Sequence, residues 1–195
     1  MNYLAHAYLS FNNPDILVGN MLSDYIKGKK QFDYPAAVQK GIKLHRQIDN
    51  FTDTHEATAE LKKFFRPQYR LYSGAFADVV YDYFLATDIF EFRNKKALDD
   101  FSTATYKTLD TYVGLFPAPF AKIFPYMKTQ NWLGNYCHPW AIEKSLAGVA
   151  RRAAYLHESQ IAYEIFIENL AAMQHCYAAF FPDLKKFTIN QLKAV

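Results

Sequence analysis

The residues of this chain best suited to chemistry are His45 and Asp49, which stand four positions apart in the stretch 41–53. On a helix this spacing places both side chains on one face, one turn apart, where an imidazole and a carboxylate can reach one metal ion. The pair continues an apolar stripe through Val38 and Ile42, and polar groups on such a stripe need a partner. A simple mutual hydrogen bond is the alternative, so other parts of the chain have to decide between the two.

A second pair, Asp78 and Asp82, has the same spacing on a stretch rich in Val, Tyr, Phe and Leu. No Lys, Arg or His lies between Arg70 and Arg93, so neither carboxylate has a basic partner nearby in the sequence. Two like charges one turn apart destabilise a helix by about 0.2–0.5 kcal/mol, and burial adds to that cost. A divalent cation would offset both effects. The alternative is an aspartate that faces solvent or pairs with a distant arginine.

A third candidate is Asp24, which shares the face of a largely apolar helix with Asn20. His6, on the preceding helix, is a weaker candidate, because a single histidine in a core is more often structural than a ligand. Three helices would then each offer oxygen or nitrogen ligands without a thiolate. Such a set suits Mn²⁺, Mg²⁺ or Fe²⁺, with Zn²⁺ as a further alternative.

The chemistry that such a metal site usually performs is hydrolysis. The metal lowers the pKa of a bound water and neutralises charge on a phosphoryl oxygen. Basic residues nearby can hold the phosphate, and we expect this of Arg46 and of the loop with Lys27, Lys29 and Lys30. For the lysines, ordinary solvated surface is the simpler interpretation.

Helices must position all of these residues, because no segment alternates with the period of two that is typical of strands. Asn2 caps a short first helix, Asn13 and Pro14 start a second that runs to about Lys27, and Pro35 opens the helix with His45. The next helix begins after the break at 53–56 and is expected to end before Pro67. Further helices are expected at about 74–87, 96–116, 119–135, 139–156 and 160–180, with Pro182 interrupting the last and a short helix at the end. The sequence predicts one all-α domain, residues 1–195, as a bundle of roughly eight helices.

Composition excludes several classes of protein. A hydrophobic fraction of 51% with 17% aromatics excludes a disordered chain, and no apolar run is long enough to span a bilayer. The net charge of +3 is too small to argue for nucleic acid but suits an acidic partner. Cys137 and Cys176 are expected to be buried reduced thiols. The N-terminus lacks a signal sequence, so we expect a soluble, cytoplasmic protein with no membrane partner. Nothing in the composition indicates the oligomeric state.

Several motifs together resemble the bacterial acyl carrier protein phosphodiesterases. They are MNYLAH at 1–6, Gly19-Asn20 with Asp24, HRQID at 45–49 with Thr52-Asp53, and DVVYDYFL at 78–85, with weaker matches at Trp132-Leu133 and 148–152. The resemblance covers nearly the whole chain. It implies hydrolysis of the phosphodiester that links 4′-phosphopantetheine to a serine of holo-acyl carrier protein, with Mn²⁺ as cofactor. It also implies a fold related to the His-Asp metal phosphohydrolases.

The resemblance also implies roles for the candidate residues. This chain has no adjacent His-Asp pair, so the site would be a rearranged one built from Asp24, His45, Asp49, Asp78 and Asp82. On this hypothesis Asp24, His45 and Asp78 hold the metal, and Asp49 or Asp82 completes or orients the set. Catalysis is assigned to Asp24, His45 and Arg46, and Arg46 with the lysine loop meets the phosphate and the acidic carrier protein.

Two other functions remain open at the level of the sequence. One is a metal phosphohydrolase of the same fold that acts on a nucleotide or another small phosphodiester. The other is a helical binding protein without enzymatic activity, whose acidic and histidine residues form a buried hydrogen-bond network. Activity on small substrates would favour the first, and folding that is indifferent to metal would favour the second.

Overall fold

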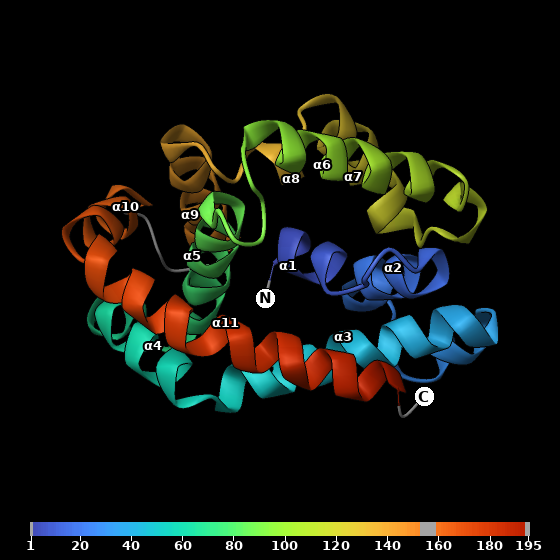
Figure 1. Cartoon of the computed structure of the whole chain (residues 1–195), viewed down its shortest axis with the longest axis horizontal. Helices are drawn as coiled ribbons and strands as arrows, with labels where there is room; N and C mark the ends of the chain where they lie inside the picture. Colours follow the sequence, from blue (N-terminus) through green and yellow to red (C-terminus); the bar gives the residue numbers. More distant parts are fainter. Residues whose placement is uncertain (1, 153–158, 194–195) are drawn as a thin grey trace.

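In this computed structural model, which describes residues 2–152 and 159–193, the chain folds into helices alone (Figure 1). The first five α-helices are α1 (Tyr3–Tyr8), α2 (Pro14–Leu22), α3 (Ala36–Thr54), α4 (Glu56–Tyr69) and α5 (Ser73–Thr87). The next six are α6 (Lys95–Asp110), α7 (Ala118–Thr129), α8 (Trp132–Asn135), α9 (Pro139–Arg152), α10 (Ser159–Glu168) and α11 (Leu170–Lys193). Short 3₁₀ helices are η1 (Ser23–Tyr25), η2 (Gly28–Asp33), η3 (Arg70–Tyr72) and η4 (Val113–Leu115). The all-α prediction is confirmed; kinship with the His-Asp phosphohydrolases stays a prediction.

The helix starts follow the local signals. The side chain of Asn2 accepts a hydrogen bond from the backbone N–H of Tyr3 (3.0 Å), and that of Asn13 accepts one from Ile16 (3.2 Å). Each satisfies an amide that the first turn of a helix leaves without an intrahelical partner. Pro35 precedes α3, where its missing N–H costs nothing.

The two prolines expected to stop helices do not. Pro67 lies inside α4 and Pro182 inside α11. A proline in a helix interior costs about 3 kcal/mol, whereas each large apolar side chain that is fully buried contributes about 1.5–3 kcal/mol. Tyr69 follows Pro67, and Phe181 and Leu184 flank Pro182, all of them buried. Packing against the core therefore holds both helices together across the proline.

Other boundaries also differ from the sequence-based expectation. The second helix ends at Leu22 rather than near Lys27, because residues 23–25 tighten into η1. The helix expected at 119–135 is divided into α7 and α8 at Asn131, which has a left-handed backbone (φ +45°) that no regular helix accommodates. The described chain has eleven α-helices rather than about eight. The predicted continuation of α9 to residue 156 lies outside the described residues.

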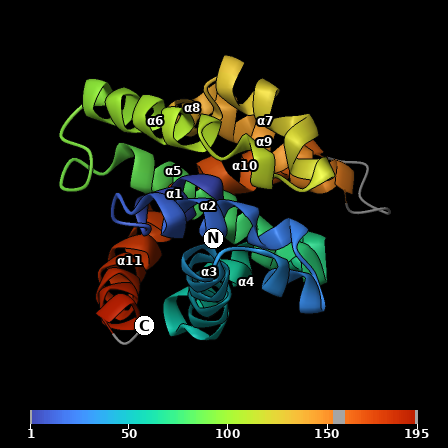
Figure 2. The same ribbon diagram turned by 90° about the vertical axis from the view of Figure 1, so that its right-hand side faces the viewer.

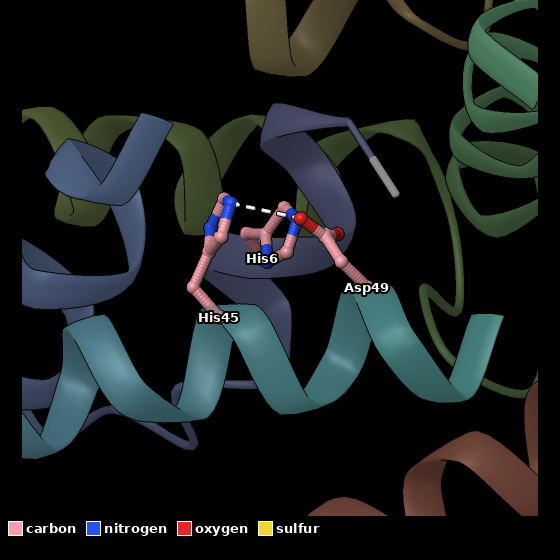
Figure 3. A group of neighbouring side chains, drawn as sticks. All are labelled: His6, His45 and Asp49. Atoms are coloured by element: carbon pink, nitrogen blue, oxygen red, sulfur yellow. Dashed lines mark ion pairs between the residues drawn. The ribbon is translucent and has the colours of Figure 1, made fainter. Parts of the chain in front are cut away.

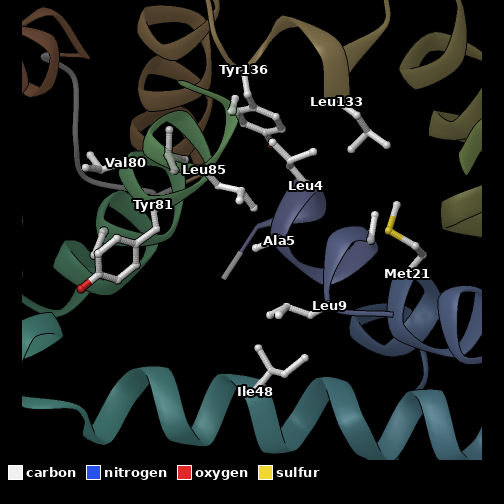
Figure 4. Packing of buried hydrophobic residues seen from close by; sticks show 14 of the residues in the cluster. Leu4, Ala5, Leu9, Met21, Ile48, Val80, Tyr81, Leu85, Leu133 and Tyr136 are labelled. Atoms are coloured by element: carbon white, nitrogen blue, oxygen red, sulfur yellow. The ribbon is translucent and has the colours of Figure 1, made fainter. Parts of the chain in front are cut away.

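The helices form three layers, with α1 in the middle one. Figures 1 and 2 show α1 and α2 between a layer that contains α3, α4 and α11 and a layer that contains α6, α7 and α8. Leu4, Ala5, His6 and Ala7 of α1 are all buried. Figure 4 shows Leu4 and Leu9 surrounded by residues from both neighbouring layers, including Ile48 and Leu133. A polar side chain on α1 is consequently held inside the protein and needs a polar partner there.

The contact between α2 and α3 is the closest helix crossing that bears on the site. A Cβ atom on Gly19 would lie 2.1 Å from the carbonyl oxygen of Val38, and one on Gly41 would lie 2.4 Å from that of Ile16. Only glycine at both positions allows the two backbones to approach so closely. The crossing places Asn20 of α2 directly against His45 of α3.

Within the part of the chain that the structure describes, no helix is long and apolar enough to cross a membrane.

Candidate metal centre

Three side chains from two helices converge at one point below α1. His6 comes from α1, and His45 and Asp49 come from α3; one ligand atom of each lies within 4.8 Å of the others. Figure 3 shows His45 and Asp49 rising from successive turns of α3 toward His6. The two imidazole rings are stacked, with centroids 3.9 Å apart. The spacing of His45 and Asp49 thus has the predicted result, since Asp49 Oδ2 is 3.1 Å from His45 Nε2.

Asn20 fixes the orientation of both histidines. Its backbone carbonyl accepts a hydrogen bond from Nδ1 of His45 (2.8 Å), and its side-chain Oδ1 accepts one from Nδ1 of His6 (2.8 Å). The Asn20 Nδ2 group donates to the carbonyl of His6 (2.8 Å) and to Ser10 Oγ (3.1 Å), which settles which end of the amide is the oxygen. Both histidines therefore carry a proton on Nδ1 and direct Nε2 into the same space, the arrangement in which a second group orients a metal-binding histidine.

Nε2 of His6 is a buried polar atom without a hydrogen-bond partner among the described residues. Asp49 Oδ1 lies 3.2 Å away, yet with the His6 proton on Nδ1 both atoms are acceptors. Burial and the adjacent His45 lower the pKa of His6 to about 4, so the ring is neutral near pH 7. Two acceptors facing each other in a buried site repel unless a cation lies between them. The donor set, two imidazole nitrogens and carboxylate oxygen, fits a divalent transition metal such as Mn²⁺ or Fe²⁺.

Carboxylates surround Nε2 of His45 on two sides. Asp24 Oδ1 and Asp49 Oδ2 each lie 3.1 Å from that nitrogen. Burial alone would lower the pKa of His45, but the two carboxylates outweigh it and raise that pKa to about 9. Burial would likewise raise the pKa of Asp49, but the two histidines hold it well below its usual range. Both shifts show that the site favours positive charge at the point where Nε2 of His45 meets the two carboxylates.

Asp24 lies at the open edge of this centre. Its side chain is 67% exposed, whereas that of His45 is 6% exposed. The hydrogen bond from His45 lowers the pKa of Asp24, so the carboxylate is ionised at neutral pH. Of the predicted site residues, the structure therefore brings together Asp24, His45 and Asp49, and it adds His6 as the second imidazole.

Asp82 has a different environment from that of the cluster. Its two carboxylate oxygens accept hydrogen bonds from the backbone N–H groups of Leu4 (2.8 Å) and Ala5 (3.2 Å), at the N-terminal turn of α1. A negative charge at this end of a helix satisfies free amides and complements the helix dipole. Burial nevertheless raises the pKa of Asp82 to about 7. Asp82 therefore anchors the helix that carries His6.

Asp78, one turn before Asp82 on α5, lines a cavity of about 580 Å³. The same cavity is lined by Asp53 and by the basic side chains of Lys62, Arg66 and Arg70. Burial raises the pKa of Asp78. Its ligand atoms do not join the His6, His45 and Asp49 group of the described residues. No pattern in the sequence links Arg66 and Arg70 to Asp78, because their place beside α5 depends on tertiary packing.

Arg46 contacts the loop that follows η1. It donates hydrogen bonds to Gln31 Oε1 (2.8 Å) and to the carbonyl of Ile26 (3.2 Å). Lys27, Lys29 and Lys30 are exposed on this loop, which begins immediately after Asp24 and Tyr25. Arg46 thus ties the basic loop to α3, one residue from His45.

Fold and site together define a class of helical protein with a candidate centre for a divalent cation. Residues 1–184 match the sequence profile described as Acyl carrier protein phosphodiesterase, and the chain belongs to that family. The family carries the name of an enzyme, a phosphodiester hydrolase, as the sequence motifs predicted.

Curated relatives of the same name align over almost their whole length. The protein of Klebsiella pneumoniae subsp. pneumoniae is 28% identical over 191 residues, which cover 98% of this chain and 99% of the relative. That of Yersinia pestis is 28% identical over 186 residues, covering 95% and 96%. That of Photorhabdus laumondii is 27% identical over 191 residues, covering 98% and 96%. No solved structure is significantly similar to the chain.

Proposed function

We propose that the protein is a divalent-metal-dependent phosphodiesterase that hydrolyses holo-acyl carrier protein to apo-carrier protein and 4′-phosphopantetheine. The observation that carries this proposal is the convergence of two histidine Nε2 atoms and a carboxylate in a chain of this family. A network that served stability alone would pair the buried Nε2 of His6 with a donor, and the described residues offer it none.

The residues that would hold the metal are His6, His45 and Asp49, with Asp24 at the open edge. Mn²⁺ is the favoured ion, and Mg²⁺ or Fe²⁺ are alternatives. A divalent cation bound there lowers the pKa of a bound water and neutralises charge on a phosphoryl oxygen. We assign Asp82 to the positioning of α1, and Asp78 to the wall of the adjacent cavity.

The protein's own groups prepare the site for hydrolysis. Asn20 accepts a hydrogen bond from Nδ1 of both imidazoles, so Nε2 is the nitrogen that each ring would present to a metal. His6 is already neutral, whereas His45 would release its Nε2 proton when the metal binds. Asp24, ionised and exposed, accepts a hydrogen bond from a water that approaches from solvent and so orients it toward the phosphorus. As the bond between phosphorus and the serine oxygen breaks, the proton of the attacking water passes to solvent and the serine oxygen takes one from solvent, which reaches the site at the open edge beside Asp24. Arg46 and the loop with the three lysines face the phosphate and the acidic carrier protein.

A mass assay tests this function. The purified protein is incubated with holo-acyl carrier protein and Mn²⁺, and the carrier is expected to lose the mass of its phosphopantetheine group. Chelation and Asp24→Ala should each abolish the loss. Asp100→Ala, which removes an exposed carboxylate paired with Lys96 on α6, is the matched control and should leave it intact. Hydrolysis of the carrier that continues in the presence of the chelator would contradict the proposed metal dependence. Hydrolysis of small phosphodiesters without any action on the carrier would identify a different substrate.

A further inference from the structure

We propose that a pocket between the start of α1 and helices α8 and α9 binds the pantetheine arm of the substrate. We name it the tryptophan pocket; its walls include Tyr3, Trp132, Tyr136, Trp140 and Gly148. The assignment rests on the proposed function, because it concerns the same substrate. The metal centre concerns only the phosphate, and the tryptophan pocket adds a site for the pantetheine arm that extends beyond it.

The size and lining of the pocket suit that arm. Its volume is about 340 Å³, within the range typical of ligand sites. The pantetheine arm is a flexible chain with two amides and a branched apolar segment. The rings of Trp132 and Trp140 offer apolar walls, while Gln130, Asn135 and Ser145 supply amide and hydroxyl groups that can hydrogen-bond to the amides of the arm.

The charge of the lining points the same way. Lys144 and Arg151 both line the pocket, and no Asp or Glu is among the described residues that line it. A ligand that carries a phosphate and is attached to an acidic protein meets a favourable potential there. Lys144 also lies over the ring of Trp140, with Nζ 5.0 Å from the ring centroid, which steadies that exposed side chain.

Two tyrosines link the pocket to the residues around the metal centre. The hydroxyl groups of Tyr3 and Tyr25 are 2.5 Å apart, and Tyr25 follows Asp24, which contacts His45. Tyr3 also precedes His6 by one turn of α1, a rise of about 4.5 Å. On this proposal, a phosphate held at the centre has its pantetheine substituent directed along α1 toward Tyr3.

Asn131 fixes the start of α8, the helix that supplies Trp132 to the wall of the pocket. Asn131 has φ +45° and ψ +56°, a left-handed conformation that asparagine adopts more readily than most residues with a side chain. Its side chain accepts a hydrogen bond from the N–H of Gly134 (3.3 Å) and so caps α8, the helix that begins with Trp132. This cap holds the first turn of α8, and with it Trp132, at the wall of the pocket.

Tryptophan fluorescence tests the pocket directly, because the chain has two tryptophans and both line it. Pantetheine, which lacks the phosphate, is titrated into the full-length protein without metal. We expect a saturable change in emission. Gly148→Leu should remove it, since a Cβ at Gly148 meets nothing within 4 Å and a leucine there would project into the open space of the pocket.

The matched control is Gly114→Leu, the same substitution at another open glycine away from the pocket. Gly148→Leu should raise KM for holo-acyl carrier protein at least tenfold, whereas Gly114→Leu should not. Thermal melting of both variants verifies that each is folded. An unchanged KM in folded Gly148→Leu, or no emission change with pantetheine, overturns the pocket. Pantetheine binding in a protein that cannot hydrolyse the carrier supports the pocket and overturns the proposed function.

Discussion

Gly19 and Gly41 touch where α2 crosses α3, so closely that a Cβ on Gly41 would lie 2.9 Å from the Cα of Gly19. This contact sets the distance between the two helices that hold the site together. Asn20 follows Gly19, and His45 lies one turn after Gly41; their hydrogen bond of 2.8 Å depends on the crossing. A local packing requirement in the core is thereby coupled to the orientation of a candidate ligand.

Gly41→Ala should destabilise the protein and disturb the site. The added methyl would contact the carbonyl of Ile16 at 2.4 Å, and overpacking of this kind costs about 1–3 kcal/mol. Gly148→Ala is the control, because its Cβ meets nothing and alanine gains up to about 1 kcal/mol over glycine in a helix. Urea unfolding should give a lower free energy of unfolding than the wild type for Gly41→Ala and a higher one for Gly148→Ala. An unchanged free energy of unfolding for Gly41→Ala would show that α2 and α3 can move apart to accept the methyl group, which contradicts the prediction.

Asn20→Leu should weaken Mn²⁺ binding about 10–100-fold, the usual effect of removing a group that orients a ligand. The substitution removes the side-chain oxygen that holds the proton of His6 on Nδ1. Asn13→Ala is the control on the same helix, since losing that cap costs about 1 kcal/mol of stability without touching the histidines. Titration of free Mn²⁺ by electron paramagnetic resonance measures both variants. An affinity of Asn20→Leu for Mn²⁺ equal to that of Asn13→Ala would show that Asn20 does not orient a metal ligand.

Asp82→Asn should change how stability depends on pH. Burial raises the folded pKa of Asp82 from its ordinary 3.8 to about 7, so the folded state binds the proton more tightly than the unfolded state. Ionisation of Asp82 therefore costs stability progressively as pH rises from about 4 to about 7, and the asparagine variant escapes that cost. Free energies of unfolding measured at several pH values should show that the stability of the wild type falls relative to that of Asp82→Asn as pH rises over this window. A constant difference between them would mean that Asp82 does not titrate there.

Salt should act on recognition of the carrier more than on chemistry. The exposed lysines of the loop that Arg46 anchors are screened as the Debye length falls from about 8 Å at 0.15 M salt to about 3 Å at 1 M. We expect KM for holo-acyl carrier protein to rise with salt while hydrolysis of bis(p-nitrophenyl) phosphate changes little. Arg46→Ala, which releases the loop, should reduce this salt dependence. Equal sensitivity of both substrates would exclude an electrostatic role for the loop.

The sequence predicted the parts of the site that lie within one helix. His45 and Asp49 are close because both lie on α3, and helical periodicity determines that. From the sequence alone His6 is the weaker candidate, because a single histidine in a core is more often structural than a ligand. Its place in the cluster depends on α1 being enclosed between two layers of helices, which no local pattern encodes.

The same limit explains the aspartates of α5. Their spacing predicted a shared role, yet Asp82 binds backbone amides of α1 while Asp78 lines a cavity beside α4. Whether a buried carboxylate meets a cation or the start of another helix depends on tertiary packing. The proline errors at 67 and 182 have a similar cause, because burial outweighs an intrinsic helix preference.

The most direct test of the account is the ligand set of Mn²⁺ in the loaded protein. Electron spin echo envelope modulation detects the nitrogen nuclei of imidazoles that bind the ion. We predict two coordinated histidine nitrogens in the wild type and one in each of His6→Ala and His45→Ala. His175→Ala, on α11, should leave both signals in place. A spectrum of the loaded wild type without nitrogen coupling would contradict the centre built from His6, His45 and Asp49.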